Sequence, residues 1–166
     1  MEIREGGADD APVLLAMLDA AVEWLASRGR TGQWGDTPWS TDPARAARVR
    51  DIAGNDDIRI ALVDGKPAGA MALSSGPPRY VEPVDEPEVY VTLLVTDRAC
   101  AGRGVGSALL RTAREEALRR GAALLRVDCY AGDDGRLVEY YTGNGFVRDR
   151  TFSVDGWPGQ LLTRRL

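Results

Sequence analysis

The chain has 166 residues, a net charge of −4 and no histidine. The acidic balance, with an estimated pI of 4.9, argues against nucleic acid as the main partner, and the missing histidines exclude His-based triads, general bases and metal ligands. With 44% hydrophobic and 28% charged residues, the composition is that of a single folded domain spanning residues 1–166.

Nothing in the sequence points to a membrane or to secretion. No apolar run nears the ~18 residues of a membrane span, and the first ten residues lack the basic-then-apolar pattern of a secretory signal. We therefore expect a cytoplasmic protein with no membrane partner. Cys100 and Cys129 have no metal-site companions, so we expect reduced thiols and no bound metal.

The first half of the chain reads as alternating short elements. In chain order, the sequence predicts a strand over 2–5, helices over 8–28 and 43–53, a hairpin of strands over 57–63 and 67–74, and a Pro-rich loop over 76–87. Asp9 or Asp10 is expected to cap the first helix, Thr41 or Asp42 the second, and Asp64-Gly65 forms the hairpin turn.

Trp34 and Trp39 lie close together in the loop between the two predicted helices. Two interpretations stay open: both rings cover the edge of the core, or they form a wall of a substrate pocket.

The second half is built around a strand, a glycine-rich turn and a helix. Val89 to Val95 is rich in β-branched and apolar residues, as in a buried strand. After the turn, a helix runs to Gly121, followed by a strand over 123–130, a short helix over 136–142, a strand from Phe146, a turn over 155–158 and a last strand over 160–166. Together with the hairpin, this order predicts an α/β fold with a mixed sheet and helices on both faces.

The glycine-rich turn predicts an anion site. Gly102, Gly104 and Gly106 come just before a helix whose first N–H groups have no intrahelical partner. The helix dipole adds positive potential there, and glycine lets an anion approach the backbone. The pattern therefore favours a phosphate or pyrophosphate ligand but does not identify the molecule that carries this group.

A Rossmann-type dinucleotide site is one reading of this turn. In its favour, Asp128 ends the next strand 22 residues after Gly106, near the ~20 expected for a ribose-binding carboxylate. Against it, the third glycine of the fingerprint is replaced by Ser107 or Leu109, depending on the register.

A second reading covers more of the chain, because two motifs resemble the GNAT superfamily of acyl-CoA-dependent N-acetyltransferases. The segment from Ala101 to Gly106 is similar to the family signature Gln/Arg-x-x-Gly-x-Gly/Ala, and the segment from Tyr141 to Phe146 is similar to the family's Tyr-x-x-x-Gly-Phe. Ala101 stands where the family usually has Gln or Arg. The resemblance extends over the whole chain and implies the GNAT fold, with a mostly antiparallel central sheet and helices on both faces.

The resemblance also implies an acetyl-CoA site. Acetyl-CoA would act as co-substrate, its pantetheine arm beside the strand that ends at Val95, its pyrophosphate on the backbone amides after Ala101, and its acyl carbonyl near a backbone N–H. The implied contact residues are Leu93, Leu94, Val95, Gly102, Arg103, Gly104, Val105, Gly106 and Ser107.

Two side chains are then expected to move protons. Tyr141 matches the family's general acid, since a phenol of pKa about 10 suits protonation of a thiolate. Asp128 is the first candidate for the base, because a carboxylate inside the apolar strand LLRVDCY is out of pattern and would be desolvated. Glu88 is the second candidate, and a water relay without a single base is the third.

The acceptor is expected to be a primary amine on a small molecule or a peptide, with the small molecule favoured because Trp34, Trp39 and the Pro-rich loop could narrow the site. A non-catalytic acyl-CoA-binding module is the main functional alternative. The sequence leaves a homodimer open.

Overall fold

The computed structural model describes all 166 residues. Its strands are β1 (Glu2–Gly6), β2 (Asp57–Val63), β3 (Lys66–Ser74), β4 (Glu88–Thr96), β5 (Leu124–Tyr130), β6 (Val147–Val154) and β7 (Trp157–Arg165). Its α-helices are α1 (Ala11–Ala26), α2 (Pro43–Asn55), α3 (Val105–Arg119) and α4 (Arg136–Gly143), and single 3-10 turns form η1 (Ala8–Asp10), η2 (Trp39–Thr41), η3 (Arg98–Cys100) and η4 (Asp133–Gly135).

The strands are hydrogen-bonded in the order β1-β2-β3-β4-β5-β7-β6. The pair β4–β5 is parallel, whereas β1–β2, β2–β3, β5–β7 and β6–β7 are antiparallel. The predicted mixed, mostly antiparallel sheet is therefore confirmed. None of the helices has the length and hydrophobicity that crossing a membrane would require.

The chain forms two compact units. The first unit comprises Met1–Leu73 and Leu93–Leu109, and the second comprises Ser74–Thr92 and Leu110–Leu166. β4 and α3 each contribute residues to both. The single domain expected from the sequence stays a prediction.

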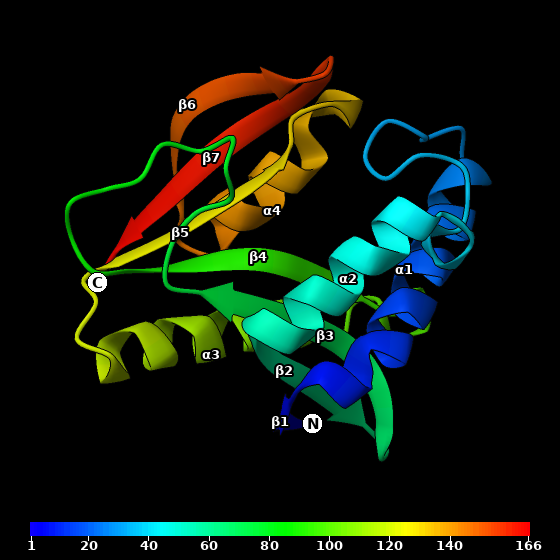
Figure 1. Ribbon diagram of the computed structural model, residues 1–166, viewed down its shortest axis with the longest axis horizontal. Helices are drawn as coiled ribbons and strands as arrows, with labels where there is room; N and C mark the ends of the chain where they lie inside the picture. Colours follow the sequence, from blue (N-terminus) through cyan, green and yellow to red (C-terminus); the bar gives the residue numbers. More distant parts are fainter. The chain divides into compact units, whose positions relative to one another are not determined.

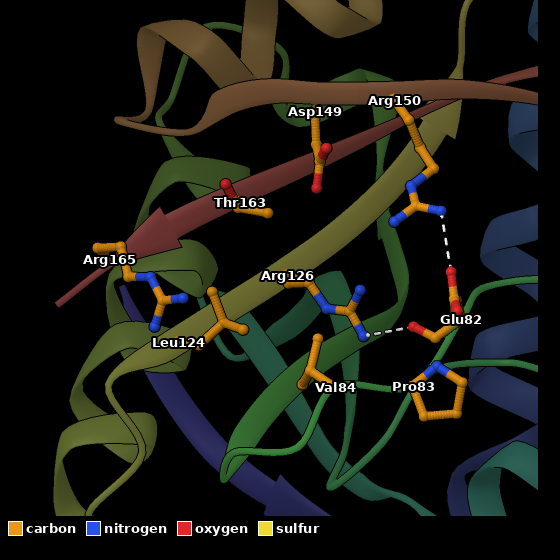
Figure 2. A pocket seen from close by; sticks show the side chains of 9 residues that line it. All are labelled: Glu82, Pro83, Val84, Leu124, Arg126, Asp149, Arg150, Thr163 and Arg165. Atoms are coloured by element: carbon orange, nitrogen blue, oxygen red, sulfur yellow. Dashed lines mark hydrogen bonds and ion pairs between the residues drawn. The ribbon is translucent and has the colours of Figure 1, made fainter.

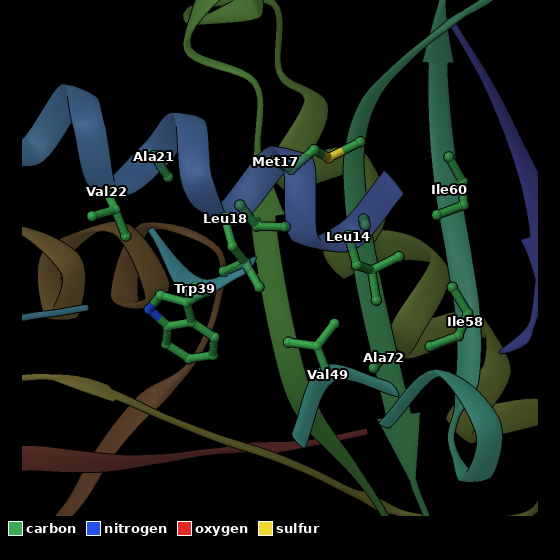
Figure 3. Close-up of a cluster of buried hydrophobic side chains, with 12 residues drawn as sticks. Leu14, Met17, Leu18, Ala21, Val22, Trp39, Val49, Ile58, Ile60 and Ala72 are labelled. Atoms are coloured by element: carbon green, nitrogen blue, oxygen red, sulfur yellow. The ribbon is translucent and has the colours of Figure 1, made fainter. Parts of the chain in front are cut away.

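In the first unit, helices lie on both faces of the strands. Ile58 and Ile60 of β2 pair with Ala72 and Ala70 of β3, and these four side chains share a buried cluster with α1 and α2 (Figure 3). Successive strand residues point to opposite faces, so Gly69 faces the other way, where it meets the first turns of α3. The predicted covering of both faces is thus confirmed within this unit.

In the second unit, β5 lies between β4 and β7, and β6 forms the edge beyond β7 (Figure 1). Helix α4 packs against β5 and β6. The side chains of Val81, Tyr90 and Leu161 form a small buried cluster, so the Pro-rich loop that carries Val81 is packed onto this part of the sheet.

Local sequence signals account for most element boundaries. Asp42 caps α2 by accepting hydrogen bonds from the backbone N–H groups of Ala44 and Arg45 at 3.0 and 3.3 Å. Asp64 and Gly65, with φ of 52° and 75°, form the two-residue turn between β2 and β3. Both features were predicted.

Two elements start three residues away from the predicted position, and the other boundaries agree within two residues. The 3-10 turn η1 precedes α1, which begins at Ala11 instead of Ala8; the Asp10 carboxylate binds Arg4 at 2.7 Å and the Gly7 N–H at 2.9 Å and does not cap α1. β7 begins at Trp157 instead of Gln160, because Asp155 and Gly156 both have positive φ and close a two-residue turn that pairs Val154 with Trp157.

Candidate functional site

The glycine-rich turn leaves its backbone bare. After η3, Gly102 and Gly104 have φ of +78° and +73°, which side chains rarely adopt, and a Cβ at either position would have no neighbour within 4 Å. The space over the turn is therefore open, as a backbone site for a phosphate requires.

The turn leads directly into the amino end of α3. Ala108 N–H donates to the Gly104 carbonyl at 3.0 Å. The amides of Val105, Gly106 and Ser107 precede Ala108 in the chain and belong to the first turn of the helix. The dipole and the free N–H groups of a helix amino end attract anions. The residues present fit the diphosphate expected from the sequence.

Arg103 lies in the same turn and is only loosely held. Its guanidinium is 3.7 Å from the Asp64 carboxylate, and the two side chains are 54% and 86% exposed. A surface pair of this kind contributes at most about 1 kcal/mol. Arg103 can therefore exchange this partner for a phosphate.

The strands fix the position of the turn through a close approach. A Cβ on Gly69 would lie 2.7 Å from Val105 Cγ1, 3.1 Å from Leu109 Cδ1 and 3.3 Å from the Val95 carbonyl oxygen. Gly69 therefore lets β3 pass directly beside the start of α3. The sequence did not point to Gly69, because a single glycine in a strand does not reveal which residues it contacts.

The three residues predicted to line the pantetheine arm lie on β4. Val95 is buried in the apolar cluster of the first unit and Leu93 packs against that cluster, while Leu94 is partly exposed. Their proposed role concerns backbone groups, so it stays a prediction.

In the second unit, Asp128 is the centre of a hydrogen-bonded group. The hydroxyl of Tyr90 donates to Asp128 Oδ1 at 2.5 Å, and the hydroxyl of Tyr80 donates to Oδ2 at 3.1 Å. The two bonds fix the orientation of the carboxylate. Sequence reasoning missed both tyrosines: Tyr90 is a polar interruption of an apolar strand that could have been noticed, whereas Tyr80 lies in a loop and gives no signal.

Tyr141 is buried on α4, where its ring makes edge contacts of 5.7 Å with Tyr140 and with Phe146. Burial raises the pKa of Tyr141, and the nearby Cys129, Tyr140 and Asp128 raise it further. Its hydroxyl therefore keeps its proton at neutral pH, as a general acid must. The same burial raises the pKa of Cys129 to about 12, which rules out a thiolate at this position at neutral pH.

Glu88, the second candidate base, is held in a buried ion pair. The Arg126 guanidinium donates to both carboxylate oxygens of Glu88, from Nε at 2.5 Å and from Nη2 at 2.8 Å, and both side chains are almost fully buried. The pair raises the pKa of Arg126, chiefly through the hydrogen bond to Glu88. Glu88 is therefore occupied by a partner that the sequence did not reveal.

Arg126 also lines a pocket of about 240 Å³ in the second unit (Figure 2). The other lining residues are Glu82, Pro83, Val84, Leu124, Asp149, Arg150, Thr163 and Arg165. Each of its arginines already has a carboxylate partner, since Arg150 pairs with Glu82 at 3.1 Å and Arg165 with Glu86 at 2.7 Å. The pocket is thus a polar hollow without an excess of free positive charge.

Trp39 belongs to the core. It is 8% exposed in the apolar cluster of the first unit, and its indole N–H donates to the Trp34 carbonyl at 3.0 Å (Figure 3). Trp34 packs against the same cluster, with its ring 6.5 Å from Trp39 in an edge contact. Of the two interpretations of this pair, the structure favours the covering of the core edge.

Comparison with known proteins is consistent with this geometry. Three solved structures share the fold: a ribosomal-protein-alanine N-acetyltransferase from Brucella melitensis (21% identity, 100% of both chains covered, TM-score 0.66); a GCN5-related N-acetyltransferase from Rhodopseudomonas palustris (23%, 99% of this chain and 95% of that chain, 0.72); and yncA from Salmonella typhimurium, solved with its cofactor acetyl-CoA (19%, 100% and 94%, 0.66). No curated protein matches the sequence.

The model of the Acetyltransferase (GNAT) family matches residues 18–146, which include the glycine-rich turn, Asp128 and Tyr141. This match covers most of the chain and includes both motifs that the sequence analysis singled out. The protein is therefore a member of the GNAT family of acetyltransferases and an acyltransferase, in a family that uses acetyl-CoA.

Proposed function

We propose that this protein transfers the acetyl group of acetyl-CoA to a primary amine on a small molecule. The observation that carries the proposal is the bare turn at Gly102 and Gly104, with open space above it and the amino end of α3 behind it. Gly29 also combines a positive φ with open space, so the helix amino end behind the turn is the second feature that the proposal needs.

The first unit would hold acetyl-CoA, which supplies the acetyl group as an activated thioester. The amides from Gly102 to Ser107 would bind its diphosphate, and Arg103 would add a charge-assisted hydrogen bond. Backbone groups of Leu93, Leu94 and Val95 would bind the pantetheine arm. Because these are main-chain contacts, Ala101 in place of Gln or Arg leaves them intact.

The second unit would supply the proton transfers. Asp128, oriented by Tyr80 and Tyr90, would bind the ammonium form of the acceptor and take its proton. Tyr141, which keeps its proton at neutral pH, would give one to the departing thiolate. The buried pair with Arg126 favours Asp128 over Glu88 for the first role.

The small-molecule acceptor is supported by the Pro-rich loop, which brings Tyr80 onto Asp128 and buries Val81 against the sheet. A loop packed over this face leaves less room for an extended polypeptide. The cytoplasmic location, the absence of nucleic-acid partners and a homodimer stay predictions.

The cofactor half of the proposal can be tested with two matched glycine variants. Gly104→Ala and Gly29→Ala each place a Cβ at positive φ in open space, at 73° and 69°. Both should lose about 1 kcal/mol of unfolding free energy. Only Gly104→Ala should weaken binding of CoA in calorimetry, because Gly29 follows α1 and lies outside the turn. Equal CoA affinity in the two variants would refute the site.

Turnover needs a separate test, because a non-catalytic acyl-CoA-binding module would pass the first one. Purified protein with acetyl-CoA and a panel of primary amines should release free thiol faster than acetyl-CoA hydrolyses alone. Tight CoA binding without amine-dependent thiol release would establish the binding module instead.

A further inference from the structure

Four aromatic rings form a continuous row in the second unit. Ring centroids are separated by 5.5 Å between Tyr80 and Phe152, 6.3 Å between Phe152 and Trp157, and 5.7 Å between Trp157 and Tyr130. Tyr80 is 40% exposed and the other three are partly exposed. Phe152 packs against the buried cluster of Val81, Tyr90 and Leu161 on one side, and the exposed parts of the four rings offer aromatic surface to a ligand.

Glycine residues create the space in which two of these rings lie. Gly159 of β7 pairs with Phe152 on one side and with Tyr130 on the other. A Cβ on Gly159 would lie 2.3 Å from the Phe152 ring, and a Cβ on Gly132 would lie 2.2 Å from the Tyr130 hydroxyl. Both rings therefore lie directly against the backbone of these glycines, where any side chain would clash with them.

Asp128 stands at the edge of this row. It lies two residues before Tyr130 on β5, so the two side chains point to the same face of the strand. Tyr80 joins the two features, because its hydroxyl donates to Asp128 and its ring contacts Phe152. A carboxylate beside aromatic faces is the combination that attracts an organic ammonium, through charge and through cation–π contact.

The Pro-rich loop holds this arrangement in place through consecutive residues. Tyr80 bonds Asp128, Val81 is buried with Tyr90 and Leu161, and Glu82 accepts from Arg126 through its carbonyl at 3.2 Å and pairs with Arg150 through its carboxylate (Figure 2). The loop is therefore a fixed wall of the surface. The pocket lined by Arg126, Arg150 and Arg165 lies on the Glu82 side of the loop. Its arginines are paired with carboxylates, so the pocket offers an acceptor no excess positive charge.

We infer that the aromatic row of Tyr80, Tyr130, Phe152 and Trp157 receives the carbon skeleton of the acceptor. The preferred acceptors are primary amines with an aromatic or similarly apolar skeleton and no carboxylate beside the amine, because a second carboxylate at Asp128 would be repelled. The inference rests on the proposed function, which puts the acceptor amine at Asp128.

Three simple amines separate the effect of an aromatic ring from the effect of a carboxylate beside the amine. 2-Phenylethylamine has the ring and no carboxylate, phenylalanine adds the carboxylate to the same skeleton, and ethanolamine lacks the ring. With acetyl-CoA and wild-type protein, kcat/KM measured by thiol release should be highest for 2-phenylethylamine. The advantage should be at least about tenfold over ethanolamine, the size of a hydrophobic-pocket preference, and larger over phenylalanine.

Substitutions in the aromatic row test whether its rings cause the preference for 2-phenylethylamine. Phe152→Leu and Trp157→Leu should raise KM for 2-phenylethylamine about tenfold and lower kcat/KM for ethanolamine by a clearly smaller factor, with the Kd for CoA unchanged. Trp24→Leu is the matched control, because Trp24 lies in the first unit with the guanidinium groups of Arg28 and Arg98 over its ring at 4.0 and 3.6 Å. It should not alter the ratio between the amines.

The outcomes distinguish the inference from the function beneath it. Equal use of the three amines, or an equal loss for all of them in the row variants, would overturn the aromatic acceptor and leave the acetyltransferase. If no amine raised thiol release above the hydrolysis of acetyl-CoA alone, the proposed function would be overturned, and the inference would fall with it.

Discussion

The two units of this protein are stabilised in different ways. The first contains the large apolar cluster beneath α1 and α2, whereas all four buried polar or charged residues, Glu88, Glu116, Arg126 and Gln160, lie in the second. Each unit, taken by itself, offers different groups to a ligand: the first offers backbone amides, and the second offers titratable side chains. An apolar core can hold a turn of bare backbone in a fixed position. Side chains that transfer protons need polar surroundings, in which the other buried polar groups have partners of their own.

The largest expected effect concerns the buried ion pair of the second unit. Arg126→Met leaves the Glu88 carboxylate buried without its partner, which should lower the unfolding free energy by about 3–5 kcal/mol in urea denaturation. The double variant Arg126→Met with Glu88→Leu should recover most of the loss, because no charge is then left unpaired. A loss below about 1 kcal/mol in the single variant would mean that the pair is not buried.

The first unit should respond to cavities instead of charges. Leu18 is fully buried against β2 and β3, so Leu18→Ala should lower the unfolding free energy by about 2–5 kcal/mol. Leu118, 47% exposed on α3, provides the control, and Leu118→Ala should stay within about 0.5 kcal/mol of the wild type. Equal losses in the two variants would remove the distinction between core and surface leucines.

Tyr141→Phe tests whether the second unit supplies an acid. The substitution keeps the ring contacts with Tyr140 and Phe146 and removes only the hydroxyl, so kcat should fall by about 10²-fold or less. The Kd for acetyl-CoA should hardly change, since the amides of the first unit bind the diphosphate. Parallel losses in turnover and in CoA affinity would make Tyr141 a packing residue.

The smallest effect is a pH dependence in the second unit. Hydrogen bonds from Arg119 and then Arg120 lower the pKa of Glu116 to about 2, below its unfolded value of about 4.5. Because the folded pKa is the lower one, this stabilisation is fully present above pH 4.5 and is lost as the pH falls towards 2. It amounts to at most about 1 kcal/mol, as Arg119 is 70% exposed.

Acid titration of the unfolding free energy checks this sign. Wild type and Glu116→Gln should differ at neutral pH and converge as the pH falls towards 2. A difference that grows in acid would show that the pKa shift has the opposite direction.

The sequence by itself determined the elements and the family. The Asp42 cap, the Asp64-Gly65 turn and the strand–glycine–helix unit are local, because each depends on residues within a few positions of one another. The two GNAT motifs are local in the same way, so they could be recognised in the sequence. They in turn predicted the contacts of acetyl-CoA and the candidates Tyr141 and Asp128.

Only the tertiary structure decided which side chains meet. Glu88 and Arg126 are 38 residues apart, and Tyr80 and Asp128 are 48 apart. No spacing rule links such pairs, so the sequence shows neither that Arg126 occupies Glu88 nor that Tyr80 bonds Asp128. The aromatic row likewise depends on Gly159 pairing with both Phe152 and Tyr130. Strand pairing sets these neighbours, and pairing between distant segments is not encoded in any single stretch of the chain.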